Sequence, residues 1–207
     1  MSQQGKSNLE KWPDYLLGLS LFGWAVAGIV QSWGDTTALF PVRLSLASLQ
    51  AMVGVLIFLR PLAREAGDVR SLLLSLPSFL ASGILFRLAS PLAAWPLPSK
   101  WIFAGGVLWV MLCFWSLRRS FAILPARRAL VRGGLYRLLR HPAYLGEYIM
   151  ACACAYAAAS VWAWICLVVL VPLLVVRIRQ EEDLLMHDAD YVRYQQATRW
   201  RLLPGVW

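Results

Sequence analysis

The sequence predicts an all-α protein that crosses a membrane about six times and ends in a cytosolic helical segment. Hydrophobic residues make up 59% of the 207-residue chain, and charged residues only 15%. This is more apolar than soluble domains usually are. Successive apolar runs are separated by short polar breaks without a linker. We therefore expect a single integral membrane domain over residues 1–207.

The apolar runs are long enough to be spans, because a transmembrane helix needs about 20 mostly apolar residues. The first run lacks the short core and small-residue cleavage site of a secretory signal, so we interpret it as a retained span. In chain order, the candidate spans are Tyr15–Trp33, Val42–Leu59, Ser71 to about Ala94, Trp101–Leu117 and the long stretch Ala143–Val176.

The stretch Ala143–Val176 decides the topology, since it is long for one helix and short for two. Lys and Arg near span ends collect on the cytosolic side. A hairpin with its turn near Ala157 to Trp162 gives six spans and places both termini in the cytosol. Nearly all of the 20 basic residues then lie on one side: Lys6, Lys11, Arg60, Arg64, Arg70, Arg118, Arg119, Arg127, Arg128, Arg132, Arg137, Arg140, Arg177, Arg179, Arg193, Arg199 and Arg201.

The net charge of +9 is therefore explained by topology, and we expect no nucleic-acid partner. We expect an integral membrane protein of a bacterial-type inner (cytoplasmic) membrane, with both termini cytosolic. Arg87 lies inside the third run, where it either reaches the outer interface or binds an anionic group. The cysteines lack metal-ligand spacing, so we expect no metal.

The loop before Ala143 carries repeated arginines and ends in Arg140-His141-Pro142. The proline restricts His141 to non-helical conformations and suits the first turn of the next helix. The free amide groups of that helix, beside Arg140 and His141, suit the carboxylate or ribose hydroxyls of a small polar cofactor. The simpler alternative is a basic loop that attracts anionic headgroups, with a structural histidine.

Three consecutive acids, Glu181, Glu182 and Asp183, follow the last apolar run. They need a cationic partner, which is either a ligand or the arginine loop in a surface salt-bridge network. We expect Asp188 to cap a further helix that holds Tyr191, Tyr194 and Trp200.

The order of these residues resembles the isoprenylcysteine carboxyl methyltransferase superfamily, which includes the phospholipid N-methyltransferases. The resemblance covers Arg118 to Trp207 and lies in the ordered combination of motifs. The matching residues are Arg140-His141-Pro142-x-Tyr144-x-Gly146, Arg177, Glu181-Glu182, Tyr191-x-x-Tyr194 and Leu203-Pro204-Gly205.

The resemblance implies a cytosol-facing S-adenosylmethionine site in residues 118–207, behind N-terminal transmembrane helices in residues 1–117. Arg177 would position the carboxylate of the substrate or cofactor, and Glu181 and Glu182 would act in catalysis and cofactor binding, one of them pairing with the cofactor's amino group. The remaining cofactor-binding residues implied are Arg140, His141, Pro142, Tyr144, Leu145, Gly146, Tyr191 and Tyr194.

The leading hypothesis is a methyltransferase that acts on a lipid or another lipophilic acceptor, including prenylcysteine-type acceptors, which enters from the bilayer. A carboxylate or thiolate acceptor needs no general base, whereas an amine or alcohol needs one, with Glu181 or Glu182 as first suspect. The alternatives are an NADPH-dependent enzyme similar to the sterol reductases and a non-catalytic lipid-binding or transport protein. Sequence leaves the acceptor, the methylated atom and the oligomeric state open.

Overall fold

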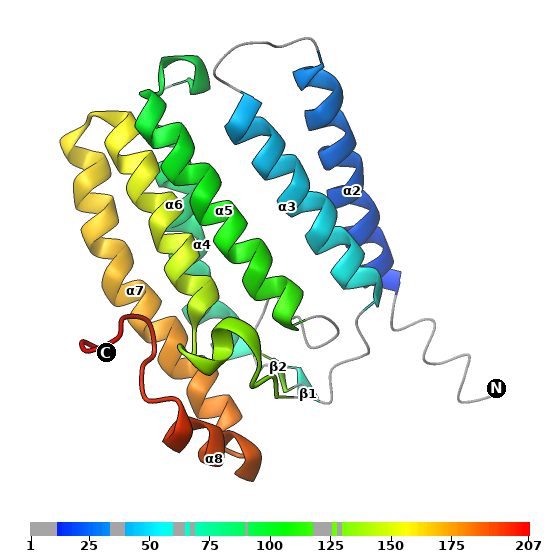
Figure 1. Ribbon diagram of the computed structural model, residues 1–207, viewed down its shortest axis with the longest axis vertical. Coiled ribbons are helices and arrows are strands. Elements are labelled where there is room, and N and C mark those ends of the chain that lie inside the picture. Colours follow the sequence, from blue (N-terminus) through cyan, green and yellow to red (C-terminus); the bar gives the residue numbers. More distant parts are fainter. Residues whose placement is uncertain are drawn as a thin grey trace.

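A computed structural model describes residues 12–33, 40–59, 65–66, 69–89, 91–117, 126–127 and 130–207. Helices α2 to α7 run side by side in Figure 1, with α8 beyond one end of α7. The predicted all-α class is confirmed, apart from one antiparallel pair of two-residue strands. The elements are α2 (Trp12–Ser32), α3 (Phe40–Leu59), β1 (Glu65–Ala66), α4 (Val69–Leu88), η1 (Leu92–Ala94), α5 (Leu97–Leu117), β2 (Ala126–Arg127), η3 (Gly134–Arg137), α6 (Pro142–Ala158), α7 (Val161–Leu185) and α8 (Ala189–Ala197).

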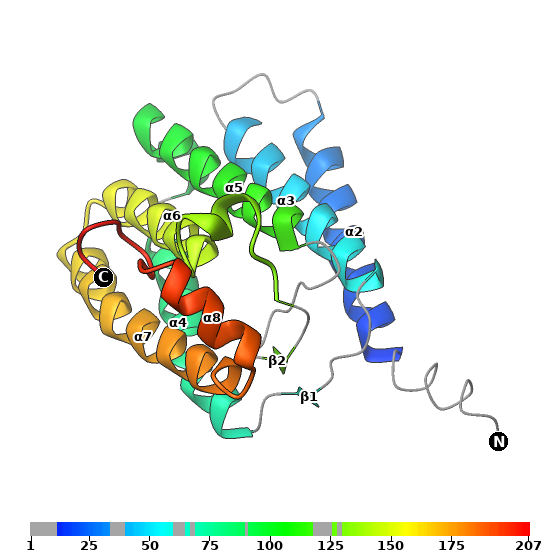
Figure 2. The same cartoon turned by 60° about the horizontal axis from the view of Figure 1, so that its bottom comes forward.

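The helices do not pack in chain order. Helix α2 packs on α3, α3 on α5, and α5 on α6, whereas α4 packs against α7 and α6. Figure 2 shows α4 beside α7, away from α2. Buried side chains from α3 to α7 form one apolar cluster that includes Val42, Leu85, Val107 and Leu170. The third predicted span therefore lies with the last two.

Three helical segments of the described chain are long and apolar enough to cross a membrane: Pro41–Leu59, Leu97–Leu117 and Val161–Leu185. Two shorter apolar segments, Tyr15–Val30 and Leu73–Leu88, accompany them. Helix α6 has 17 residues and lies between α5 and α7. These helices fit an integral membrane protein, and the count of about six spans stays a prediction.

The long stretch Ala143–Val176 forms the predicted hairpin. Helix α6 ends at Ala158 and α7 begins at Val161, within the expected turn region. Ala159 ends α6 in the left-handed conformation, with φ of 46°. Glycine usually occupies this position. Because an alanine occupies it here, the sequence shows no glycine signal for the turn.

Two predicted boundaries were wrong. The third span was expected to reach about Ala94, but α4 ends at Leu88 and a separate 3-10 turn follows Pro91, because a proline has no amide hydrogen to continue a helix. Trp200 was expected in the last helix, but α8 ends at Ala197. Part of the topological argument lies outside the described residues, namely Lys6, Lys11, Arg60, Arg64, Arg118, Arg119 and Arg128.

Two glycines let α5 and α6 approach closely. A Cβ atom on Gly146 would lie 2.6 Å from Val110 Cγ2 and 3.1 Å from the carbonyl oxygen of Gly106. Trp109 is also within 2.9 Å of that position, and its Nε1 donates a 2.8 Å hydrogen bond to the carbonyl of Pro142. Small residues permit such crossings of membrane helices. The crossing fixes the first turn of α6 against α5.

Replacing Gly146 with alanine should therefore destabilise the protein, by about 1–3 kcal/mol if the neighbours shift only partly. Gly105→Ala is the matched control in α5, because nothing lies within 4 Å of its Cβ position. That control should be neutral or slightly stabilising, since alanine favours helix over glycine. Thermal unfolding in detergent measures both, and equal stability of the two variants would contradict the close crossing.

Candidate functional site

The first turn of α6 forms one side of the candidate site. His141 precedes the helix with φ of −127° and ψ of 54°, and Pro142 starts the helix, as the sequence predicts. Both residues are buried, and Leu145 is half-buried. Gly146 faces α5, so its observed contribution is to helix packing.

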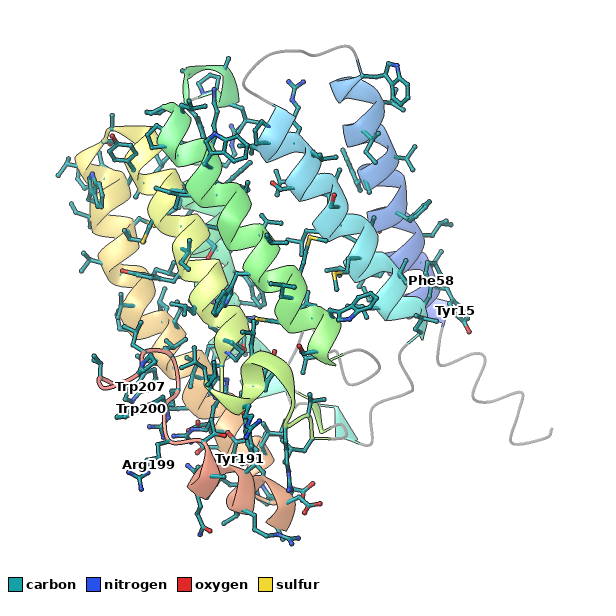
Figure 3. All side chains as sticks on the ribbon, viewed as in Figure 1. Tyr15, Phe58, Tyr191, Arg199, Trp200 and Trp207 are labelled. Atoms are coloured by element: carbon teal, nitrogen blue, oxygen red, sulfur yellow. The ribbon has the colours of Figure 1, made fainter. Side chains whose placement is uncertain are left out.

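The segment after α8 returns to this turn and pairs with it through the main chain. The amide groups of Arg140 and His141 donate 2.9 Å hydrogen bonds to the carbonyls of Trp200 and Arg201. Arg140 Nη2 also donates to the carbonyl of Arg199 at 3.1 Å. Figure 3 shows Arg199 and Trp200 on this tail, at the same end of the helices as Tyr191 of α8. The tail therefore brings Arg201 into the site.

Glu182 of α7 is the centre of a buried ion-pair network. Its Oε1 atom lies 2.8 Å from Arg140 Nη1 and 3.2 Å from His141 Nε2. Its Oε2 atom lies 2.8 Å from both Nε and Nη2 of Arg201. Glu182 is only 4% exposed. The arginine loop thus supplies a partner for the acids through Arg140, as one alternative expected, but the network is buried and does not lie at the surface.

Glu181, the neighbouring acid, is much less constrained. Its Oε2 accepts a 2.7 Å hydrogen bond from the Tyr144 hydroxyl and lies 3.6 Å from His141 Nδ1. Within the described residues no polar contact reaches its Oε1, and 32% of the side chain is exposed. One acid of the pair is therefore neutralised, whereas the other retains a free oxygen.

A second buried pair lies one helical turn farther into the bundle. Arg177 precedes Glu181 by four residues of α7, a rise of about 6 Å. Its Nη1 lies 3.1 Å from Oε2 of Glu147 in α6. The guanidinium carbon lies 4.4 Å from the centre of the Tyr144 ring, whose hydroxyl reaches Glu181. Arg177 was expected to position a carboxylate of the substrate or cofactor, and in the structure its carboxylate partner is Glu147.

Helix α4 completes this deeper pair with residues that sequence reasoning missed. Ser82 Oγ donates a 3.1 Å hydrogen bond to Glu147 Oε1, and Ser78 Oγ lies 3.4 Å from Arg177 Nη1. The Phe79 ring lies 3.9 Å from the guanidinium carbon of Arg177. The sequence did contain a signal for the deeper pair. Glu147 of α6 is the only charged residue before Arg177 in its apolar run, and an acid in such a run is a functional candidate by default.

Helix α8 covers the site with two buried tyrosines. Asp188 caps the helix as expected, accepting a 2.8 Å hydrogen bond from the amide of Asp190. The Tyr194 hydroxyl donates a 2.6 Å hydrogen bond to the carbonyl of Tyr136, and burial raises the pKa of Tyr194 to about 12. The Tyr191 hydroxyl is buried beneath α8 next to the guanidinium of Arg140, and the two groups interact. Helix α8 therefore contacts the Glu182 network through Arg140.

The charge of His141 is set by the two acids. Burial by itself lowers the pKa of His141, but the carboxylates of Glu181 and Glu182 outweigh it, so the pKa is raised above its usual range. The ring of His141 also stacks on that of Tyr144, with centroids 5.7 Å apart. The site thus favours an imidazolium between two carboxylates.

Arg87, the basic residue of the third span, lies away from this site. It is exposed in the last turn of α4, next to η1 at the opposite end of the bundle. Among the described residues, no group of three His, Cys, Asp or Glu side chains is arranged to hold a metal ion.

The comparison with known families adds a second line of evidence to this geometry. Residues 99–189 match the phospholipid methyltransferase family. The match confirms the resemblance to the membrane methyltransferase superfamily. Nothing among curated proteins or solved structures matches the chain.

The region similar to the phospholipid methyltransferase family extends from α5 to the start of α8 and contains both site segments, Arg140 to Gly146 and Arg177 to Glu182. Together with the apolar helices, it indicates an integral membrane methyltransferase. Helix α4, Tyr191 and Arg201 lie outside the match, although they contact residues inside it. The site is therefore larger than the matched domain.

Replacing Glu182 with Gln should strongly destabilise the domain, by about 3 kcal/mol or more, because two arginines and His141 lose a buried counter-charge. Asp190→Asn is the matched control. Asp190 pairs with Arg132 and Arg193, but its side chain is 54% exposed, so its loss should cost about 1 kcal/mol or less. Thermal unfolding in detergent measures the loss of stability in both variants. A similar loss in the two would show that the Glu182 network does not make a major contribution to the stability of the fold.

The contribution of His141 to the stability of the folded protein should depend on pH. Because the folded-state pKa is raised above 6.5, the stability from the imidazolium is full below about pH 6.5 and is lost as pH rises through the folded-state pKa. The difference in unfolding temperature between the wild type and His141→Gln should therefore shrink from pH 6 towards pH 9. A difference that grows with pH would show that the folded protein favours neutral His141.

Proposed function

We propose that the protein is an S-adenosylmethionine-dependent methyltransferase whose lipophilic acceptor enters from the bilayer. One observation carries the proposal. The two acids are differentiated, since Glu182 is neutralised by Arg140, His141 and Arg201, whereas the Glu181 side chain is 32% exposed and its Oε1 has no polar contact within the described residues. A neutralised acid supports the local fold, and an accessible one is available to a ligand.

The chemistry of the side chains fits this cofactor. Its amino-acid end is zwitterionic and needs an acceptor for the ammonium group and donors for the carboxylate. Glu181 supplies the acceptor. Arg140 and the Tyr191 hydroxyl, which are buried next to each other beneath α8, are the candidate donors for the carboxylate.

The cofactor supplies an electrophilic methyl group, and the protein contributes binding and orientation. Methyl transfer requires in-line approach, so positioning dominates catalysis. His141 and Tyr144 would hold the Glu181 side chain, while Pro142 and Leu145 would form the wall at the start of α6. Tyr191 and Tyr194 would cover the site from α8, and Gly146 would act by fixing α6 against α5.

The two acids differ as general bases. Both oxygens of Glu182 are engaged by cationic groups, which makes this carboxylate a poor proton acceptor. If the acceptor is an amine or alcohol, Glu181 is the better candidate. A carboxylate or thiolate acceptor would need neither.

The topology belongs to the same proposal. We place both termini and the site on the cytosolic face, in an inner-membrane protein that forms one domain over residues 1–207. The catalytic region then lies in residues 118–207, behind the N-terminal helices of residues 1–117. Basic residues near the span ends support this orientation.

Calorimetric titration of the purified protein with S-adenosylmethionine tests the proposal. Glu181→Gln should weaken binding by about tenfold or more, because a hydrogen bond to a charged group is lost. Asp183→Asn is the matched control, since Asp183 is an exposed neighbour in the same run of acids. Absence of binding at millimolar cofactor would sink the methyltransferase, and NADPH binding at this site would favour the reductase.

A further inference from the structure

The chain after α8 forms a closed loop, residues 199–207, whose tip carries exposed apolar side chains. The main-chain oxygen of Trp207 accepts a 2.9 Å hydrogen bond from the amide of Arg201 and closes this C-terminal loop. At the tip, the Val206 amide donates to the Leu203 carbonyl at 3.2 Å, and Gly205 has φ of 82°, which glycine adopts without strain. Leu203 and Val206 are 48% and 76% exposed. The turn therefore presents two apolar side chains to the surroundings.

The C-terminal loop lies beside the helices and does not extend beyond them. Figure 1 shows the chain ending beside α7, whereas α8 lies beyond one end of α7. In Figure 3, Arg199 points towards the α8 end, and Trp200 and Trp207 lie nearer the apolar helices. Tryptophan collects at the boundary of a bilayer and arginine collects on its cytosolic side. The loop therefore has the position and the residue order of a segment at a membrane surface.

Basic residues accompany the apolar tip, and acids are absent from the loop. The sequence from Thr198 to Trp207 contains Arg199 and Arg201 and no acidic residue. Arg199 is exposed, and so is Arg137 of η3, whose carbonyl accepts a 3.5 Å hydrogen bond from the Thr198 hydroxyl. Exposed apolar side chains beside arginines bind a surface that offers both hydrocarbon and negative charge. A leaflet that contains anionic lipid offers both.

The same loop supplies a contact to the centre of the candidate site. Arg201 donates from Nε and Nη2 to Oε2 of Glu182, both at 2.8 Å, and its guanidinium carbon lies 5.1 Å from the centre of the Trp207 ring. The Trp200 carbonyl accepts the 2.9 Å hydrogen bond from the amide of Arg140. Fixing the tip would reduce the conformational freedom of the loop, which lowers the entropic cost of holding Arg201 on Glu182.

We propose that the C-terminal loop docks on an anionic lipid surface at this end of the bundle and thereby holds Arg201 on Glu182. Leu203 and Val206 enter the boundary between the headgroups and the acyl chains, and the two exposed arginines lie against the lipid phosphates. The docking follows from the geometry of the loop alone, whereas its effect on cofactor binding rests on the proposed function.

A fluorophore at the loop tip tests the docking. Val206→Cys is labelled in nanodiscs of anionic lipid that carry a nitroxide near the headgroup, and the signal of labelled wild type is subtracted because of its native cysteines. Gln196→Cys is the matched control, since Gln196 is also exposed but lies in α8. The nitroxide should quench the label at position 206 and leave the label at position 196 unquenched.

The lipid charge should contribute to the docking. Quenching at position 206 should be weaker in nanodiscs of uncharged lipid, and high salt should weaken it in anionic nanodiscs. Arg199→Gln should lower the ratio of docked to undocked loop about fivefold, because an arginine near an anionic surface contributes about that much. Arg193→Gln is the control, since Arg193 is exposed in α8 and pairs with Asp190, and it should leave the quenching unchanged.

Titration with S-adenosylmethionine in the same nanodiscs tests the connection to the site. Val206→Asp places a charge at the tip and opposes its entry into the bilayer, so the cofactor should bind this variant more weakly than wild type. Gln196→Asp should bind the cofactor as wild type does. In an uncharged detergent the difference between Val206→Asp and wild type should shrink, because neither loop has an anionic surface to dock on.

Several results would overturn the inference. They are equal quenching at positions 206 and 196, quenching that does not depend on lipid charge, and equal cofactor affinity of Val206→Asp and wild type in anionic nanodiscs. A tip label that is shielded from aqueous iodide but not quenched by the nitroxide would place the tip against protein and would also overturn it. Absence of S-adenosylmethionine binding in every preparation would refute the proposed function, and the quenching would still decide the docking.

Discussion

Glu182 brings a carboxylate into a region almost closed to solvent, and the surrounding chain is arranged to balance its charge. Arg140 and His141 come from the turn before α6, and Arg201 comes from the tail after α8. A buried ion without partners is costly, so these three segments must meet for the end of α7 to be stable. The same meeting places Glu181 beside Tyr144, whose hydroxyl donates a hydrogen bond to it.

The candidate site has two polar levels separated by an aromatic ring. Glu181, Glu182 and His141 form the level at the helix ends, and Arg177 with Glu147 forms the deeper level. Tyr144 touches both, because its hydroxyl reaches Glu181 and its ring lies against Arg177. This arrangement suits a reaction in which a polar cofactor and a lipophilic acceptor arrive from different environments and must be aligned.

The deeper level depends on packing that is not local in sequence. Helix α4 leaves its chain neighbours and packs against α6 and α7, which brings Ser78, Phe79 and Ser82 to the Arg177–Glu147 pair. Charged groups inside a bilayer protein are tolerated when they pair and face the bundle interior. The close crossing of α5 and α6 at Gly106 and Gly146 fixes the opposite side of α6. The first turn of α6 is thus held between two helices.

Sequence by itself determined the helical class, the hairpin, the break at His141-Pro142 and the cap at Asp188, because each follows from hydrophobicity, charge or local backbone chemistry. It also indicated the family through the order of short motifs. Tertiary structure decided which acid is neutralised, that the tail supplies Arg201, and that α4 joins the site. Those outcomes depend on contacts between residues far apart in the chain, such as Ser82 with Glu147 and Arg201 with Glu182. No local pattern encodes such contacts, since they arise only when the helices pack.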